Sequence, residues 1–110
     1  NKNGHTIGLH THSHPTKIDK MNKQTQLKEY LTNKKKLSEI LNISQDYLTT
    51  MSHPCGNYNK DTLDILRKLG VKLGFSNQML TGKHQQLSKI SKKNLEIPRN
   101  DHSLILKLIN

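Results

Sequence analysis

Short segments rich in strand-forming residues alternate along this chain with segments whose apolar residues recur every three or four positions. Residues 5–10 (HTIGLH), 46–51 (DYLTTM) and 71–76 (VKLGFS) are typical of strands. The segments between them, 19–42 and 60–69, have the apolar spacing of helices. Strand, helix, strand, helix, strand is the order of an α/β domain with parallel strands, and this is the fold class that we predict.

The longer predicted helix, within residues 19–42, presents one apolar stripe, and its lysines fall largely outside that stripe. An apolar stripe at helical spacing is expected to face the core. The members of the stripe are Leu27, Tyr30, Leu31, Leu37, Ile40 and Leu41.

The shorter predicted helix has recognisable signals at both ends. Asn59 is a favoured N-cap residue, and Gly70 is a natural C-terminal stop. One face between them carries Leu63, Leu66 and Leu69. After a polar stretch, residues 95–98 (LEIP) predict a further strand and residues 101–109 (DHSLILKLI) a closing helix.

Length and composition limit the number of domains and the classes of partner. The 110 residues suffice for one domain, and 31% hydrophobic residues predict a thin core. The net charge of +10 comes from scattered lysines without interleaved aromatic side chains, so we expect no nucleic-acid partner. No apolar run reaches about 18 residues, so we expect no transmembrane segment. The lone cysteine, Cys55, excludes an internal disulfide and a multi-cysteine zinc site.

Two loops with chemically active side chains follow the first two predicted strands. Residues 8–16 (GLHTHSHPT) follow the first strand, and residues 52–59 (SHPCGNYN) follow the second. In α/β folds, ligands bind beyond the carboxyl ends of the strands. We therefore expect both loops to border one site.

His10, His12 and His14 occupy every second position of the first loop. In an extended segment all three rings share one face, whereas in a helical turn only His10 and His14 do. Either geometry brings His10 and His14 to one metal ion and leaves His12 as the weaker candidate. Two imidazoles are an incomplete zinc site, so a carboxylate ligand must come from elsewhere. The alternative is that the histidines are polar surface residues.

The segment NGHTIGLHTHSHP (3–15) resembles the second motif of the polysaccharide deacetylases, the NodB-homology enzymes of carbohydrate esterase family 4. His10, Thr11 and His14 match its His-Ser/Thr-x-x-His pattern, and Pro15 follows as it often does in that family. The resemblance implies a distorted (β/α) barrel of strands alternating with helices. It also implies a divalent metal ion, usually zinc, bound by His10 and His14.

The segment MSHPCGNYNKDTLDILRKLGVKLGFS (51–76) resembles the third motif of the same family, with Pro54, Gly56 and Tyr58 as matches. Ser52 stands where many members have an arginine that orients the catalytic base, and Cys55 replaces the usual tyrosine. In the family the backbone N–H at that tyrosine donates to the oxyanion, a role that Cys55 can retain.

The resemblance extends to other pocket residues. It implies substrate-pocket roles for Pro54, Gly56 and Tyr58. His53, next to Pro54, either lines the same pocket or simply fills the loop. The segment IPRND (97–101) resembles a late segment of many members and implies pocket or catalytic roles for Arg99 and Asp101.

Taken with the family pattern, residues 1–110 are expected to form a single, partial deacetylase domain. The first motif, which carries the catalytic base and the third metal ligand, is expected upstream of residue 1, and the fifth motif, which carries the general acid, is not recognisable. The implied function is metal-dependent removal of N- or O-acetyl groups from a carbohydrate, and the amide bond cleaved is not a peptide bond. The missing strands are expected from an absent segment or from a second copy.

Two rival interpretations use the same residues. The segment LHTHS (9–13) also resembles the start of the PHP phosphoesterases and the amidohydrolases, but those families do not account for the loop at 52–59. A domain that keeps a carbohydrate groove without catalysis is the other alternative. Metal affinity separates this remnant from an enzyme, because two imidazoles without a carboxylate bind zinc weakly.

Overall fold

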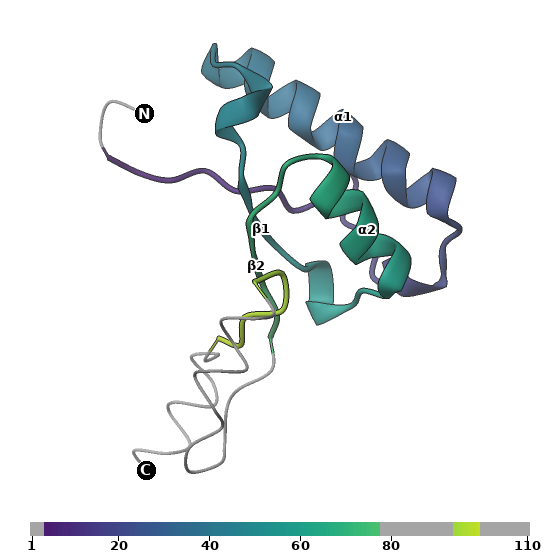
Figure 1. The fold of residues 1–110 in the computed structure, drawn as a ribbon. Helices are drawn as coiled ribbons and strands as arrows, with labels where there is room; N and C mark the ends of the chain where they lie inside the picture. Colours follow the sequence, from purple (N-terminus) through teal and green to yellow (C-terminus); the bar gives the residue numbers. More distant parts are fainter. Residues whose placement is uncertain (1–3, 78–93, 100–110) are drawn as a thin grey trace, which may run out of the picture.

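The computed structural model describes residues 4–77 and 94–99 (Figure 1). It contains two α-helices, α1 (Lys23–Leu41) and α2 (Lys60–Lys68), and two strands, β1 (Thr50–Ser52) and β2 (Leu73–Phe75). Short 3-10 helices connect them at Ile18–Lys20, Gln45–Tyr47 and Pro54–Gly56. None of the helices in the described ranges is both long and apolar enough to cross a membrane.

The sheet consists of parallel segments that neighbour one another in sequence order. β1 pairs with β2, and Met51 lies opposite Gly74. Leu9 bridges to Met51 on one side and Ile97 to Phe75 on the other, both in the parallel sense. Sequential order is what a (β/α) barrel has, whereas a doubly wound sheet reverses its order at a switch point. Both helices lie on one side of the strands (Figure 1). The predicted α/β class and partial-barrel architecture are therefore confirmed.

The two faces of the sheet have different surroundings. Leu9 and Met51 form a buried row with Gly74, and they pack in the same core as Tyr30 of α1 and Leu66 of α2. Side chains alternate between the faces of a strand, so the next row points away from the helices. This row lies at the carboxyl ends of the strands, on the sheet face that the two helices do not cover. Its members are His10, Ser52, Phe75 and Ile97.

Helix α1 forms largely where predicted, but its buried face differs from the predicted stripe. Its buried residues are Gln26, Tyr30 and Lys34, each one turn apart. Of the predicted stripe, Leu31 and Ile40 are 43% and 77% exposed, so their prediction as core residues was wrong. The reason is tertiary: Gln26 bonds to Thr62 of α2, and the Lys34 ammonium donates to the Leu69 carbonyl at its end.

Helix α2 follows its sequence signals. Asn59 accepts a hydrogen bond from the backbone of Thr62, whose hydroxyl accepts one from the Asn59 backbone, so a complete capping box begins the helix. Leu66 is fully buried. Gly70 adopts a φ of +79° just after the helix, a conformation that suits glycine.

The strands are shorter than predicted. Of residues 5–10 only Leu9 forms a bridge, and of residues 95–98 only Ile97 does. The first two residues of the strand predicted at 46–51 belong instead to the 3-10 helix Gln45–Tyr47, because Ser44 caps that turn by accepting from the Asp46 backbone. The predicted closing helix at 101–109 lies outside the described residues.

Candidate metal centre

The two histidines that the sequence singles out lie side by side. Thr11 and His14 have φ values of +69° and +55°, so the loop is neither extended nor helical and turns back on itself. The turn brings the rings of His10 and His14 to a centroid separation of 4.8 Å, at an interplanar angle of 52°. His12 is exposed and is not part of this pair.

The orientation of the His10 ring is fixed by a backbone carbonyl. Its Nδ1 lies 2.7 Å from the Ser52 oxygen at the end of β1. A carbonyl oxygen can only accept, so Nδ1 carries the proton and Nε2 of the neutral ring keeps its lone pair. A hydrogen bond of this kind on one ring nitrogen is the usual support for a histidine that binds metal through the other.

Helix α1 holds the backbone of the histidine loop through two polar side chains. Asn33 accepts a hydrogen bond from the His10 N–H at 2.9 Å. Both carboxylate oxygens of Glu29 accept from Ser13, one from its N–H and one from its hydroxyl, each at 2.9 Å. Glu29 and Asn33 were missed by the sequence analysis. The available signal was their four-residue spacing, which places two polar side chains on one face of the helix.

The paired imidazoles fit two positions of a zinc site. A tetrahedral ion about 2.0–2.1 Å from each ligand nitrogen places two ring centroids roughly 5 Å apart. The separation of His10 and His14 agrees with this value. Among the residues that the structure describes, no group of three His, Cys, Asp or Glu side chains could hold a metal ion. The described residues therefore offer two candidate ligands, His10 and His14, one fewer than a catalytic zinc requires.

The loop after β1 presents a backbone N–H group. Cys55 is exposed, and its backbone is in the left-handed conformation, with φ of 55°. Within the described part of the chain, its N–H donates to no acceptor. Gly56 also has a positive φ, of 70°, and a Cβ there would lie 2.1 Å from the Asn77 oxygen. Asn57 ties this loop to the end of the histidine loop by donating to the Thr16 carbonyl at 2.6 Å.

His53 and Tyr58 form a stacked pair beneath this loop, with centroids 4.2 Å apart. His53 is fully buried, and its Nε2–H donates to the Leu95 carbonyl at 2.7 Å. Burial lowers the pKa of His53, partly opposed by this hydrogen bond. The Tyr58 hydroxyl donates to Glu96 at 2.9 Å, and burial together with that carboxylate raises the pKa of Tyr58 to about 12. The pair holds segment 95–96 against β1.

The remaining predicted site residues are distributed around this region. Pro54 is buried and begins the 3-10 helix of the loop. Arg99 is exposed and lies two residues beyond Ile97, at the carboxyl end of the sheet. Asp101 lies outside the described residues.

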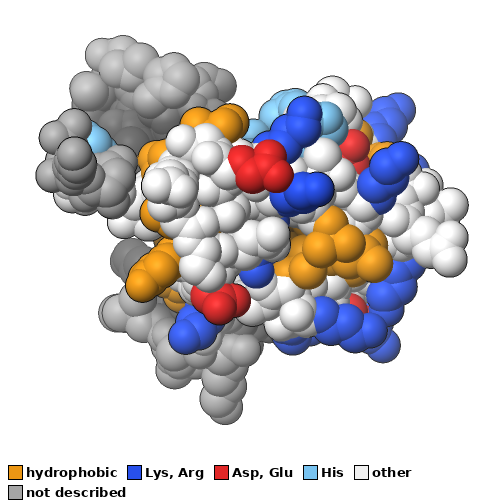
Figure 2. Space-filling view, turned by 90° about the horizontal axis from the view of Figure 1, so that it is seen from above, with side chains coloured by type: hydrophobic (Ala, Val, Ile, Leu, Met, Phe, Trp, Pro, Cys, Tyr) orange, Lys and Arg blue, Asp and Glu red, His pale blue; other side chains and the backbone are white. Residues whose placement is uncertain are grey.

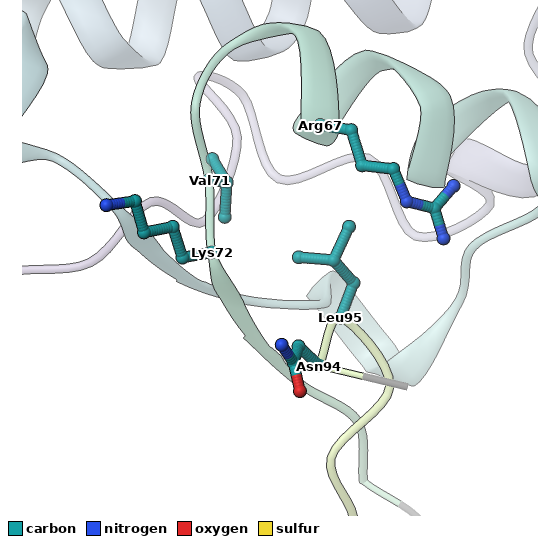
Figure 3. A pocket seen from close by; sticks show the side chains of 5 residues that line it. All are labelled: Arg67, Val71, Lys72, Asn94 and Leu95. Carbon is teal, nitrogen blue, oxygen red and sulfur yellow. The ribbon is translucent and has the colours of Figure 1, made fainter. Parts of the chain in front are cut away.

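Two other surface features of the described residues do not form a comparable site. A cavity of about 360 Å³ lies at the opposite end of β2, and its two cationic side chains, Arg67 and Lys72, extend away from each other (Figure 3). Arg67 is also paired with Asp64 at 3.4 Å. On the face shown in Figure 2, Lys and Arg side chains are spread out with acidic side chains between them. Neither feature gathers polar groups on one point.

Comparison with known proteins agrees with this geometry. The family model described as polysaccharide deacetylase matches residues 1–74 of the 110. No curated protein matches the chain. Among solved structures, the Streptococcus pyogenes deacetylase PplD in complex with acetate is similar, with a TM-score of 0.66 and 26% sequence identity. The match covers 84% of this chain and 37% of that one, so the chain spans just over a third of the length of PplD. The chain belongs to the polysaccharide deacetylase family.

Proposed function

We propose that this chain forms part of a metal-dependent hydrolase that removes N- or O-acetyl groups from a carbohydrate. The observation that carries the proposal is the pairing of His10 and His14, with the His10 Nδ1–H bound to the Ser52 carbonyl. This arrangement leaves the Nε2 lone pair of His10 available beside a second imidazole. Family membership supports the substrate class.

The residues divide the chemistry between two loops. A divalent cation held by His10 and His14, with zinc as the expected ion, would supply Lewis-acid activation of water and of the acetyl carbonyl. The Cys55 N–H, which has no acceptor among the described residues, donates to the carbonyl oxygen as it gains negative charge. Asn57 links the two loops and keeps this donor at a fixed position relative to the histidines.

Further residues of the chain shape the substrate pocket in this proposal. Pro54 and Gly56 set the path of the loop at residues 52–59, which carries the Cys55 N–H, and His53 and Tyr58 pack beneath it. Arg99, at the carboxyl end of the neighbouring segment, and Asp101 are the additional polar groups. The third metal ligand, the catalytic base and the general acid come from outside the described residues.

Zinc titration of the purified chain tests the metal site. We expect one zinc ion per chain, bound weakly because two imidazoles are an incomplete ligand set. His10→Ala and His14→Ala should each lower the affinity by roughly 10-fold or more. His12→Ala is the matched control, because His12 is exposed in the same loop, outside the pair. Equal zinc affinity in all three variants and the wild type would overturn the proposal.

Acetate release tests the reaction itself. Acetylated oligosaccharides incubated with the zinc-loaded protein, in a form that also supplies the third metal ligand, the catalytic base and the general acid, should yield acetate, and His10→Ala should abolish the release. His12→Ala, purified in the same way, should release acetate as the wild type does. Loss of release in His10→Ala alone then shows that the activity does not come from a contaminant. Zinc binding without any acetate release would favour a carbohydrate-binding domain that lacks catalysis.

A further inference from the structure

The histidine loop contains a strained turn that includes one of its two candidate ligands. Thr11 and His14 have φ values of +69° and +55°, although neither is a glycine. This conformation is unfavourable for a residue with a Cβ, and it persists only where neighbouring contacts hold it. His14 is exposed, so packing in the core does not fix its conformation. The orientation of its ring therefore depends on polar contacts of the loop.

Glu29 of α1 holds the residue directly before His14. Its two carboxylate oxygens accept hydrogen bonds from the N–H and the hydroxyl of Ser13, each at 2.9 Å. Two bonds to one carboxylate fix both the position and the direction of a group, and bonds to a charged acceptor are stronger than neutral ones. Ser13 is thereby attached to the helix by two bonds, next to the strained residue.

The same face of α1 also holds the start of the loop. Asn33 lies one helical turn beyond Glu29, and its side-chain oxygen accepts a hydrogen bond from the His10 N–H at 2.9 Å. The loop at 10–14 is therefore anchored near both ends to one helix. Because the two anchors are only one turn apart, they fix the rings of His10 and His14 relative to each other, and the centroid separation is 4.8 Å.

Glu29 does not have the arrangement of a third metal ligand. Both of its oxygens are engaged by Ser13, and within the described ranges it forms no salt bridge. No group of three His, Cys, Asp or Glu side chains among these residues could hold an ion. The carboxylate therefore acts on the loop rather than on an ion.

We propose that Glu29 is a positioning residue for the metal centre and holds His14 in its ligand orientation through Ser13. This inference rests on the proposed function and deepens it, because it makes zinc affinity depend on a side chain that does not bind the ion. Ligands that are already in position bind an ion without the entropic cost of ordering them first. Loss of the anchor should therefore weaken zinc binding.

Zinc titration of the 110-residue chain tests this role. Glu29→Ala removes both bonds to Ser13 and should lower zinc affinity roughly 10-fold. In Glu29→Gln, the side-chain oxygen accepts from the Ser13 N–H and the NH₂ group donates to the Ser13 hydroxyl, so zinc affinity should stay within about threefold of the wild type. Glu39→Ala removes an exposed glutamate elsewhere on α1 and is the control for the change in net charge.

Amide hydrogen exchange gives a second readout, which needs no zinc. Without added zinc, the Ser13 amide should be protected in the wild type and in Glu29→Gln, and it should lose this protection in Glu29→Ala. The amide of Tyr30, inside α1, should stay protected in every variant and shows that each one is folded. A Ser13 amide that stays equally protected in Glu29→Ala overturns the inference.

The outcomes of the zinc titration separate this inference from the proposed function. Unchanged affinity in Glu29→Ala, when the wild type binds zinc, overturns the role of Glu29 alone. Equal weakening in Glu29→Gln or in Glu39→Ala also overturns it, because the lost charge would then be the cause. A wild-type chain that binds no zinc overturns both proposals. Weaker binding in Glu29→Ala, with rescue by Glu29→Gln and no effect of Glu39→Ala, supports the inference.

Discussion

Replacing Thr62 by valine should expose how strongly a buried polar contact holds the two helices together. Thr62 and Gln26 are both fully buried, and the threonine hydroxyl donates to the Gln26 oxygen at 2.5 Å. Valine has nearly the same shape but leaves that oxygen without this donor, which costs about 1–3 kcal/mol. It also removes the capping-box bond to the Asn59 N–H, worth about 1 kcal/mol. The free energy of unfolding should therefore fall by about 2–4 kcal/mol.

Urea unfolding of the wild type, Thr62→Val, Gln26→Met and the double variant measures this cost. Removing both partners should cost less than the sum of the single changes, with a coupling energy of about 1–2 kcal/mol. Thr25→Val is the control, because Thr25 is exposed on α1, the helix that carries Gln26, and its replacement should change stability by less than about 0.5 kcal/mol. A loss below about 0.5 kcal/mol in Thr62→Val, or strict additivity, would refute the reasoning.

Three other predictions follow from buried or strained groups. The Tyr30 hydroxyl is buried without a partner in the described residues, so Tyr30→Phe should leave stability equal or up to about 1 kcal/mol higher in urea unfolding. Burial lowers the pKa of His53, so as the pH falls, His53 is protonated in the unfolded chain before it is protonated in the folded chain. The stability that depends on the neutral His53 ring is therefore present above about pH 6.5 and is lost as the pH falls through the folded pKa. NMR of the His53 ring should show it titrating below about pH 6.5, and titration above this value would contradict the assignment. Gly56→Ala and Gly70→Ala should each cost about 1–2 kcal/mol of stability, since both sites have positive φ, but only Gly56→Ala should also reduce acetate release, through the Cys55 loop.

The sequence predicts the element order and the caps because these depend on local signals. Asn59 begins α2 through a contact three residues away, and Gly70 ends it through its own backbone conformation. The alternation of elements then dictates parallel strands with helices between them. The positions of both loops at the carboxyl ends follow from the same order.

Long-range contacts explain what the sequence does not predict. Burial of Gln26 and Lys34 requires partners on α2 and at its C-cap that lie 36 and 35 residues away, and no pattern within α1 indicates them. Ile40 is exposed for the same reason, because contact with α2 decides which face of α1 is buried, and Ile40 does not lie on that face.

The proximity of His10 and His14 was predicted from their spacing, but the contacts that support the pair were not. His10 and His14 share a ligand face in two local conformations, which is why the sequence indicates them without giving the backbone geometry. The Ser52 carbonyl that fixes the His10 tautomer lies 42 residues away and comes into place only through the register of Leu9 with Met51.

The ¹⁵N NMR spectrum of the histidine rings during zinc titration measures the metal centre most directly. Zinc should shift the Nε2 resonance of His10 and a ring nitrogen of His14, while the His10 Nδ1 keeps its proton and its bond to the Ser52 carbonyl. The His12 ring should not respond. Zinc-induced shifts confined to His12, or loss of the His10 Nδ1 proton on zinc binding, would contradict the paired-histidine site.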